Sequence, residues 1–221
     1  MSKMYFFGDS YVENLGCRPG DKYYSKTFTG VEKTWTQILS ERYGLEEVNL
    51  GKSGFTNYNF LNQIWSCIDK FTSNDKVIVR IGPYDRYNID SAVTNIKRGD
   101  LLKVDKTGDK PIYFYPIARN TSDHYRKKLS TRLSPVEIET IINFNTHILK
   151  TDKFRKQFIK NAFNNISTQL EDKNVTHFIF DHEWLNFFDD WNDIKNVHNI
   201  IPGHLTWEQH TAFAELIHNQ L

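Results

Sequence analysis

The sequence predicts an α/β protein in which helices cover both faces of a parallel sheet, and three observations predict it. Short apolar runs end abruptly in polar or glycine-bearing turns, as buried strands of a parallel sheet do. Segments with apolar residues three and four positions apart alternate with these runs, which is typical of βαβ units. The chain has 221 residues, 39% of them hydrophobic, enough for one sizeable core. We therefore expect a three-layer α/β/α sandwich in a single domain over residues 1–221.

The first third of the chain carries the clearest elements. An apolar run over residues 3–7 predicts a buried strand that ends at a Gly-Asp-Ser turn. Apolar residues at helical spacing predict a helix over 34–43, stopped by a glycine. A second strand is expected at 48–50, a second helix over 60–71 and a third strand over 77–81. This order of strand, helix, strand, helix and strand predicts a parallel sheet.

The pattern loosens over residues 86–134, which we interpret as an insertion between the third strand and the late helices. Within it, the apolar run 111–116 suits either a strand of the main sheet or part of an inserted hairpin. A helix start is predicted at Ser134, Pro135 and Glu137, because serine caps, proline fits the first helical position and glutamate suits the positive end. The later expected elements are helical segments over 138–142 and 154–170, a strand over 175–181 and a helix over 206–221.

Charge, cysteine count and hydropathy exclude several classes of protein. With 28 basic and 27 acidic side chains the net charge is +1, so we expect no nucleic-acid partner. Cys17 and Cys67 are too few for a disulfide scaffold and lack zinc-site spacing, and the histidines follow no metal-ligand pattern, so we expect no metal. The N-terminus lacks a secretory apolar region, and no stretch reaches the roughly 20 apolar residues of a membrane span. We therefore expect no membrane partner and synthesis in a cytoplasm.

Ser10 and His204 are the candidate catalytic pair. Ser10 follows the first expected strand, and active atoms of open α/β sheets lie at the carboxyl ends of strands. His204 precedes the last expected helix. A serine hydroxyl needs a nearby base to become a nucleophile, and histidine, with an ordinary pKa near ~6.5, suits that role around neutral pH. Either residue alone is a weak signal, because Gly-Asp-Ser is common in turns.

Taken together, four blocks of sequence resemble the SGNH hydrolases, also called the GDSL esterase/lipase family. The blocks occur in the family's order and sample almost the full chain. The resemblance implies the flavodoxin-like SGNH hydrolase fold. The third block diverges from the family pattern, which makes the chain look like members encoded by bacteriophages and bacterial polysaccharide loci. The four blocks are Phe6–Ser10, Val48–Gly54, Ile81–Asp85 and Gly203–His210.

The resemblance implies a role for each matching position. Ser10 is the expected nucleophile, His204 the expected base, and the backbone amide of Gly54 an expected donor to the oxyanion. Tyr84 stands where the family has an asparagine that donates to the oxyanion. Asp85 matches the aspartate beside it in the substrate-binding block, a residue that is more often structural than catalytic.

Two departures leave parts of this site open. Tyr84 has a differently placed donor from asparagine, and the candidate third donors are Asn57, Tyr84 and Asn88. Ile201 stands where the family has the aspartate that orients the imidazole, and isoleucine accepts no hydrogen bond. A backbone carbonyl can orient a histidine instead of a carboxylate. The candidate carboxylates are Asp181 and Asp193.

The sequence therefore predicts a serine esterase that hydrolyses a carboxylic ester through an acyl-enzyme, by a Ser-His dyad or triad, with no cofactor. The expected substrate is a small ester or an acylated glycan, with an O-acetyl group as the candidate acyl group. Association with a virion is expected if the chain is encoded by a phage. The sequence predicts no oligomeric state.

Two other hypotheses compete with the esterase. One is an SGNH-fold binding or structural protein with weak or no catalysis, for which Tyr84 and Ile201 are the reasons. The other is a flavodoxin-like or nucleotide-binding domain, suggested by Gly51 and Gly54 after an expected strand. The second is weaker, because the chain lacks both a complete phosphate-loop motif and the dinucleotide fingerprint.

Overall fold

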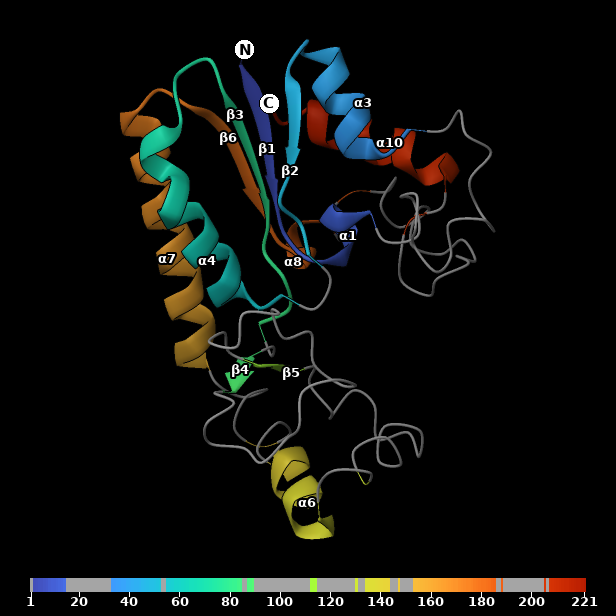
Figure 1. Cartoon of the computed structure of the whole chain (residues 1–221), viewed down its shortest axis with the longest axis vertical. Helices are drawn as coiled ribbons and strands as arrows, with labels where there is room; N and C mark the ends of the chain where they lie inside the picture. Colours follow the sequence, from blue (N-terminus) through green and yellow to red (C-terminus); the bar gives the residue numbers. More distant parts are fainter. Residues whose placement is uncertain are drawn as a thin grey trace.

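The computed structural model describes residues 2–14, 33–52, 55–84, 87–89, 112–114, 130, 134–143, 147, 153–185, 188, 205 and 207–221. These residues include a four-stranded parallel sheet, a two-stranded antiparallel sheet and helices on both faces of the larger sheet (Figure 1). The predicted α/β fold with a parallel central sheet between two helical layers is confirmed.

The central sheet consists of β1 (Lys3–Phe7), β2 (Glu46–Asn49), β3 (Lys76–Arg80) and β6 (Thr176–Phe180). The strands lie in the order β2-β1-β3-β6, and every neighbouring pair is parallel. All four carboxyl ends therefore open on one edge of the sheet. Because β1 has a neighbour on each side, Ser10 follows an interior strand at that edge.

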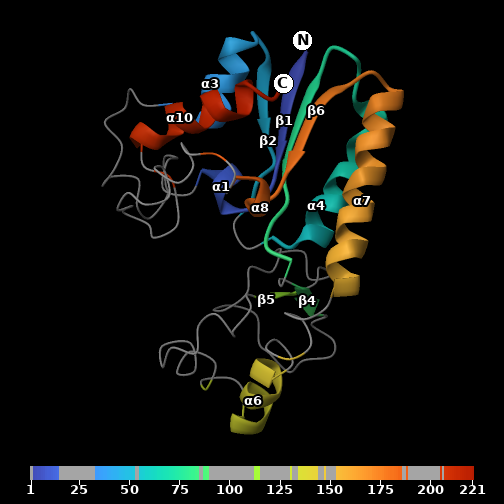
Figure 2. The same cartoon turned by 180° about the vertical axis from the view of Figure 1, so that it is seen from behind.

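Two helical layers enclose this sheet, with α4 and α7 over one face and α3 and α10 over the other (Figure 1). Figure 2 shows the same layers from behind. The helices are α1 (Ser10–Glu13), α3 (Trp35–Arg42), α4 (Asn57–Cys67), the 3₁₀ helix η1 (Ile68–Lys70), α6 (Pro135–Asn143), α7 (Lys153–Asp172), α8 (His182–Leu185) and α10 (Trp207–His218).

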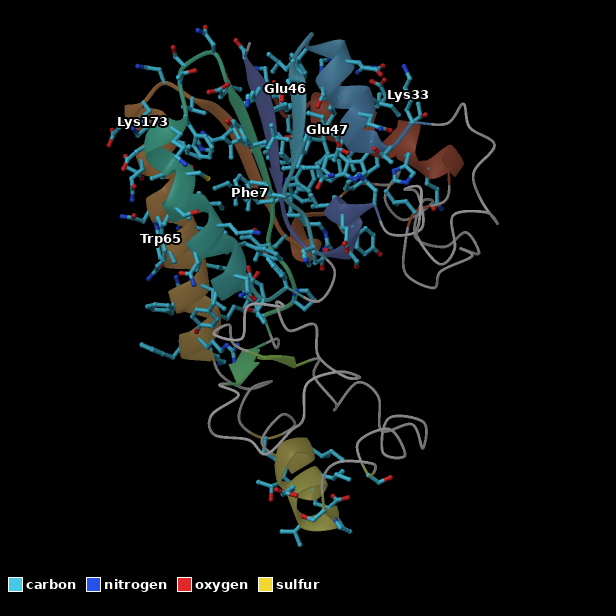
Figure 3. All side chains as sticks on the ribbon, viewed as in Figure 1. Phe7, Lys33, Glu46, Glu47, Trp65 and Lys173 are labelled. Carbon is cyan, nitrogen blue, oxygen red and sulfur yellow. The ribbon has the colours of Figure 1, made fainter. Side chains whose placement is uncertain are left out.

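Alternating side chains of the strands build one apolar core under each helical layer. In β1, Phe6 packs in the core shared with α3 and α10, whereas Phe7 packs in the core shared with α4 and α7. In β3, Ile78 and Val79 divide in the same way. This is the two-residue period of a strand that is buried on both faces. Figure 3 shows Phe7 in the interior, with Trp65 on the outer layer.

A second, two-stranded sheet pairs β4 (Tyr87–Ile89) with β5 (Ile112–Phe114) in antiparallel register. It lies beyond the carboxyl edge of the central sheet (Figure 1). Within the apolar run at 111–116, the described residues 112–114 therefore form a strand of a separate small sheet and not of the main sheet. This decides between the two alternatives that the sequence left open.

The helix boundaries follow the capping signals in the sequence. The Ser134 hydroxyl donates to the Glu137 carboxylate (2.8 Å), and the Glu137 amide donates to the Ser134 hydroxyl (3.3 Å), so the predicted start of α6 is confirmed. The helix predicted over 34–43 ends at Arg42, and Gly44 follows with a φ of 64°. Among the described residues, no helix is long and apolar enough to cross a membrane.

Candidate active site

Ser10 is the first residue of α1, directly after the turn that leaves β1. Asp9 caps this short helix, because its Oδ1 atom accepts a hydrogen bond from the Tyr11 amide (3.2 Å). The Asp9 carbonyl oxygen accepts from the Val12 and Glu13 amides. Ser10 is buried, with 6% of its surface exposed. Asp9 therefore braces the turn that presents Ser10.

A buried ion pair joins this turn to the neighbouring strand. Arg80, the last residue of β3, places Nη1 2.5 Å from Asp9 Oδ1, and the two side chains are only 4% and 2% exposed. The Arg80 guanidinium also lies over the Tyr11 ring, 4.2 Å from its centroid. Burial raises the pKa of the Tyr11 hydroxyl. The residues on both sides of Ser10 therefore contact Arg80.

The loop after β2 holds the turn from the other side. The Lys52 amide donates to the Gly8 carbonyl oxygen (2.8 Å). Asn49 connects α1 to the loop after β2. Its Nδ2 donates to the Val12 carbonyl oxygen (2.6 Å), and its Oδ1 accepts from the Gly51 amide (2.9 Å). A Cβ atom on Gly51 would lie 2.5 Å from the Glu13 amide nitrogen. Only glycine fits this close approach of the loop to α1.

Helix α3 supplies the third support. Trp35 donates through Nε1 to the Tyr11 carbonyl oxygen (3.0 Å) and through its backbone amide to Nδ1 of His210 on α10 (3.2 Å). Asn14, at the end of α1, donates to the Thr36 hydroxyl (2.9 Å). Burial lowers the pKa of His210 to about 4, so its imidazole is neutral at pH 7 and can accept the Trp35 bond. Helix α10 is thereby connected to the Ser10 turn through one tryptophan.

Asn57 fixes the loop that follows β3. It is the first residue of α4 and fully buried. Its Oδ1 accepts from the Gly82 amide (2.8 Å), and its Nδ2 donates to the carbonyl oxygens of Gly82 (3.1 Å) and Pro83 (3.4 Å). Both polar atoms of this amide are therefore engaged by the backbone that leads to Tyr84.

Tyr84 contacts the end of β6. Its hydroxyl donates to Oδ2 of Asp181 (2.7 Å), whose Oδ1 accepts from the Trp184 amide (2.9 Å). Lys160 of α7 approaches the same carboxylate (3.9 Å). Lys156 and Lys160 lie over the Tyr84 ring, with ammonium-to-centroid distances of 5.2 and 5.8 Å. The loops after β3 and β6 are thus connected by a partly exposed polar cluster.

The predicted site residues divide between described and undescribed parts of the chain. Ser10, Asn57 and Tyr84 all lie at or near the carboxyl edge of the sheet, following β1, at the start of α4 and following β3. Asp181, a candidate carboxylate, is also described and follows β6, where it accepts from Tyr84. Outside the described residues lie His204, Gly54, Asp85, Ile201 and Asp193. Asn88 is described by its backbone alone, as part of β4. No group of three or more metal-ligating side chains occurs in the described ranges.

Sequence reasoning missed the side chains that support the Ser10 turn. Arg80 had a signal, because it is the one charged residue inside an otherwise apolar run at 77–81, and charges are rarely buried unless paired. His210 is one of eight histidines that follow no metal-ligand pattern, yet its side chain is buried on α10. Asn49 gave no signal, since its role depends on α1 and the loop after β2 lying together.

Comparisons with known proteins give only distant likenesses. No protein-family model and no curated protein matches the sequence. The chain is similar to the solved structure of Axe2, an acetylxylan esterase from Geobacillus stearothermophilus, with a TM-score of 0.39 and 15% identity over 99% of this chain and 93% of that one. It is also similar to a structure described as a lipolytic protein of the G-D-S-L family from Desulfitobacterium hafniense, with a TM-score of 0.37 and 15% identity over 100% of both chains. TM-scores and identities this low do not establish a family for the chain.

Proposed function

We propose that this protein is a serine esterase in which Ser10 attacks an ester carbonyl and His204 is the base. The observation that carries the proposal is how Ser10 is held. It is a nearly buried serine at the carboxyl end of an interior strand, in a turn braced by β3, the loop after β2, and α3. Effective nucleophiles are held in one geometry before the substrate arrives, because fixed orientation lowers the barrier.

The chemistry follows from these roles. His204 takes the proton of the Ser10 hydroxyl as Ser10 Oγ bonds to the carbonyl carbon. The backbone amides of Ser10 and Gly54 stabilise the negative charge on the former carbonyl oxygen. The tetrahedral intermediate collapses, His204 returns the proton to the departing alcohol, and an acyl-Ser10 ester remains. Water, deprotonated by His204, then releases the carboxylic acid and restores Ser10.

Contacts next to the two residues support pairing Ser10 with His204. Leu205, directly after His204, packs against the apolar core that lies under α3 and α10. Tyr11, directly after Ser10, packs against the same core. Trp35 connects Tyr11 to α10, the helix that His204 precedes. Segments far apart in the sequence are therefore anchored to the same side of the sheet.

We propose a short acyl group, such as an O-acetyl group on a glycan, as the natural ester. The small exposed surface of Ser10 favours a short acyl chain, because a bulky chain would need more space beside the nucleophile. The resemblance of the third block to SGNH proteins of bacterial polysaccharide loci favours a glycan as the alcohol.

One observation favours the alternative of a binding protein with the same fold. The Tyr84 hydroxyl donates its hydrogen to Asp181, so this side chain is directed toward a carboxylate and away from the role of an oxyanion donor. Loss of one oxyanion donor costs about 10²–10³ in rate in related chemistry. A chain that lacks this donor and the aspartate at position 201 could retain binding without efficient hydrolysis.

The test is hydrolysis of para-nitrophenyl acetate and of acetylated xylan by the wild-type protein and three variants. We expect Ser10→Ala and His204→Ala each to lower kcat at least about 10³-fold. Ser40→Ala is the matched control, because Ser40 is also buried (2% exposed) but lies on α3, and its Oγ has no hydrogen-bond partner among the described residues. Hydrolysis that persists in Ser10→Ala contradicts the proposal that Ser10 is the nucleophile of an esterase. Binding of the glycan without hydrolysis favours the alternative.

A further inference from the structure

We propose that Arg80 is a positioning residue for the Ser10 nucleophile, acting through Asp9. This inference rests on the proposed esterase and adds a residue outside the four sequence blocks that carry the resemblance. In the proposed reaction Arg80 has two effects on the Ser10 turn. It fixes the direction of the carboxylate that caps α1, and it neutralises the negative charge of that carboxylate next to the developing oxyanion.

The first effect follows from how one oxygen atom is shared. Oδ1 of Asp9 accepts from both the Tyr11 amide and Arg80 Nη1. The bond to the amide sets the start of α1, where Ser10 is the first residue. The bond to Arg80 ties that oxygen to the end of β3, which is a rigid, paired strand. The Arg80 side chain therefore holds the Ser10 turn in a fixed orientation relative to the sheet.

Energetics argue that the pair is present for more than stability. Removing two charges from water costs several kcal/mol per ion, and a buried ion pair is often no better for stability than apolar side chains of the same volume. Arg80 is also incompletely satisfied, because its Nε has no hydrogen-bond partner among the described residues. Arg80 contacts the residues on both sides of Ser10, Asp9 and Tyr11. A buried charge that adds little stability but makes these two contacts is well placed to orient the Ser10 turn.

The second effect follows from the charge of the transition state. In the proposed reaction the Ser10 amide stabilises an oxyanion, and Asp9 is the preceding residue in the chain. An uncompensated carboxylate there would oppose the oxyanion. Two like charges about 5 Å apart at an effective dielectric constant near 20 correspond to about a 10²-fold change in rate. Arg80 cancels this repulsion and leaves Asp9 able to cap α1.

The two effects together predict an asymmetry between variants that break the same ion pair. Asparagine caps a helix about as well as aspartate, so Asp9→Asn retains the cap and removes only the negative charge. Arg80→Gln retains the negative charge and removes the positive charge that is paired with it. We expect kcat to fall about 10²-fold in Arg80→Gln and less than about tenfold in Asp9→Asn. Arg80→Lys, which keeps the positive charge, should retain kcat within about tenfold of wild type.

The experiment measures kcat, KM and thermal unfolding for these three variants and for the double variant Asp9→Asn/Arg80→Gln. We expect the double variant to recover about tenfold of the kcat lost in Arg80→Gln, because removing the carboxylate removes the repulsion. KM should change less than about threefold throughout. Thermal unfolding reports separately on folding, since a merely structural pair changes the melting temperature and the folded fraction without this ordering of kcat.

Arg155→Gln is the matched control. Arg155 is also a buried arginine near a tyrosine ring, 5.6 Å from the centroid of Tyr58, and it lies on α7 over the opposite face of the sheet from α3. We expect this variant to lose stability with kcat unchanged. Equal kcat losses in Arg80→Gln and Asp9→Asn, or unchanged kcat in Arg80→Gln, overturn the inference and leave the esterase standing. Absence of Ser10-dependent hydrolysis in the wild type overturns both.

Discussion

The two faces of the central sheet differ in where the hydrogen bonds of their helices lead. Under α3 and α10, directional hydrogen bonds connect one element to the next, with Trp35 bonded to both Tyr11 and His210. The Tyr43 hydroxyl and Nδ1 of His218 are 2.8 Å apart and add a further link between these two helices. Under α4 and α7, the described core is a layer of buried aliphatic and aromatic side chains. The hydrogen bonds of these two helices lead away from the Ser10 turn, from Asn57 to the loop after β3 and between Ser167 and His177 of β6 (2.6 Å).

This difference separates two requirements of an enzyme. Apolar packing is non-directional and contributes stability roughly in proportion to the area buried. Hydrogen bonds contribute less net stability but fix orientation. The Ser10 turn lies on the hydrogen-bonded side and is braced by it. We infer that the face under α4 and α7 supplies stability to a site whose geometry is set mainly by the other face.

The largest expected effect tests the apolar face. Phe163→Ala on α7 removes a ring that is 1% exposed, and the free energy of unfolding should fall by about 3–5 kcal/mol because a cavity remains. Urea denaturation measures this loss. Phe158→Ala on the same helix is the control, since Phe158 is 49% exposed and should lose far less. If kcat per folded molecule also falls more than tenfold in Phe163→Ala, the separation of the two faces is wrong.

The next effect tests the hydrogen-bonded face by pH. His210 has a pKa lowered to about 4 by burial, against about 6.5 in the unfolded chain. Between these values the unfolded chain binds a proton that the folded chain does not, so stability is complete above pH 6.5 and is lost as the pH falls toward 4. We expect a loss of about 3 kcal/mol from this group.

Urea denaturation at pH 7 and pH 4 measures the contribution of His210 by comparison with His210→Gln. Glutamine still offers an oxygen to the Trp35 amide but does not titrate. The free energy of unfolding of the wild type should therefore fall more than that of the variant over this interval. Parallel losses in the two proteins would show that His210 is not a buried neutral acceptor.

A smaller effect tests how closely the loop after β2 approaches α1. A Cβ atom at position 51 would lie 2.5 Å from the Glu13 amide nitrogen and 2.6 Å from the Val12 carbonyl carbon. Gly51→Ala should cost about 1–3 kcal/mol of stability, as overpacking does. It should also lower kcat about 10²-fold, because the helix that begins with Ser10 must shift.

Gly44→Ala is the contrasting variant for Gly51→Ala. Gly44 has a φ of 64°, and no atom lies within 4 Å of an added Cβ, so the cost is backbone strain of about 1–2 kcal/mol. We expect no change in kcat for this variant. A kcat in Gly51→Ala that matches Gly44→Ala would mean that the Ser10 turn tolerates displacement.

The elements that sequence reasoning predicted are those whose signal is local. Strands β1 and β3 and helices α4 and α7 carry apolar residues at strand or helix periods, because each element buries a face that its own sequence records. The place of Ser10 at a strand end was predictable for the same reason. The small antiparallel sheet was only one of two alternatives, since a short apolar run does not specify its pairing partner.

The supports of the site were not predictable, because they depend on contacts between distant segments. Trp35 and His210 are 175 positions apart in the chain, and Asp9 and Arg80 are 71 apart. A polar residue in a sequence does not specify its partner until the topology is known. Arg80 is the exception that sequence could have flagged, because a charge within a buried strand must be paired.

The smallest expected effect is at the edge where the loops after β3 and β6 meet. Tyr84→Phe removes a hydroxyl that donates to Asp181 at 2.7 Å and should lower stability by about 1 kcal/mol. If this hydroxyl serves only to join the two loops, kcat should change less than about threefold. If it turns toward the substrate and donates to the oxyanion, kcat should fall about 10²-fold or more. Steady-state kinetics on para-nitrophenyl acetate separates the two outcomes. The second would mean that a residue on the face under α4 and α7 also takes part in catalysis.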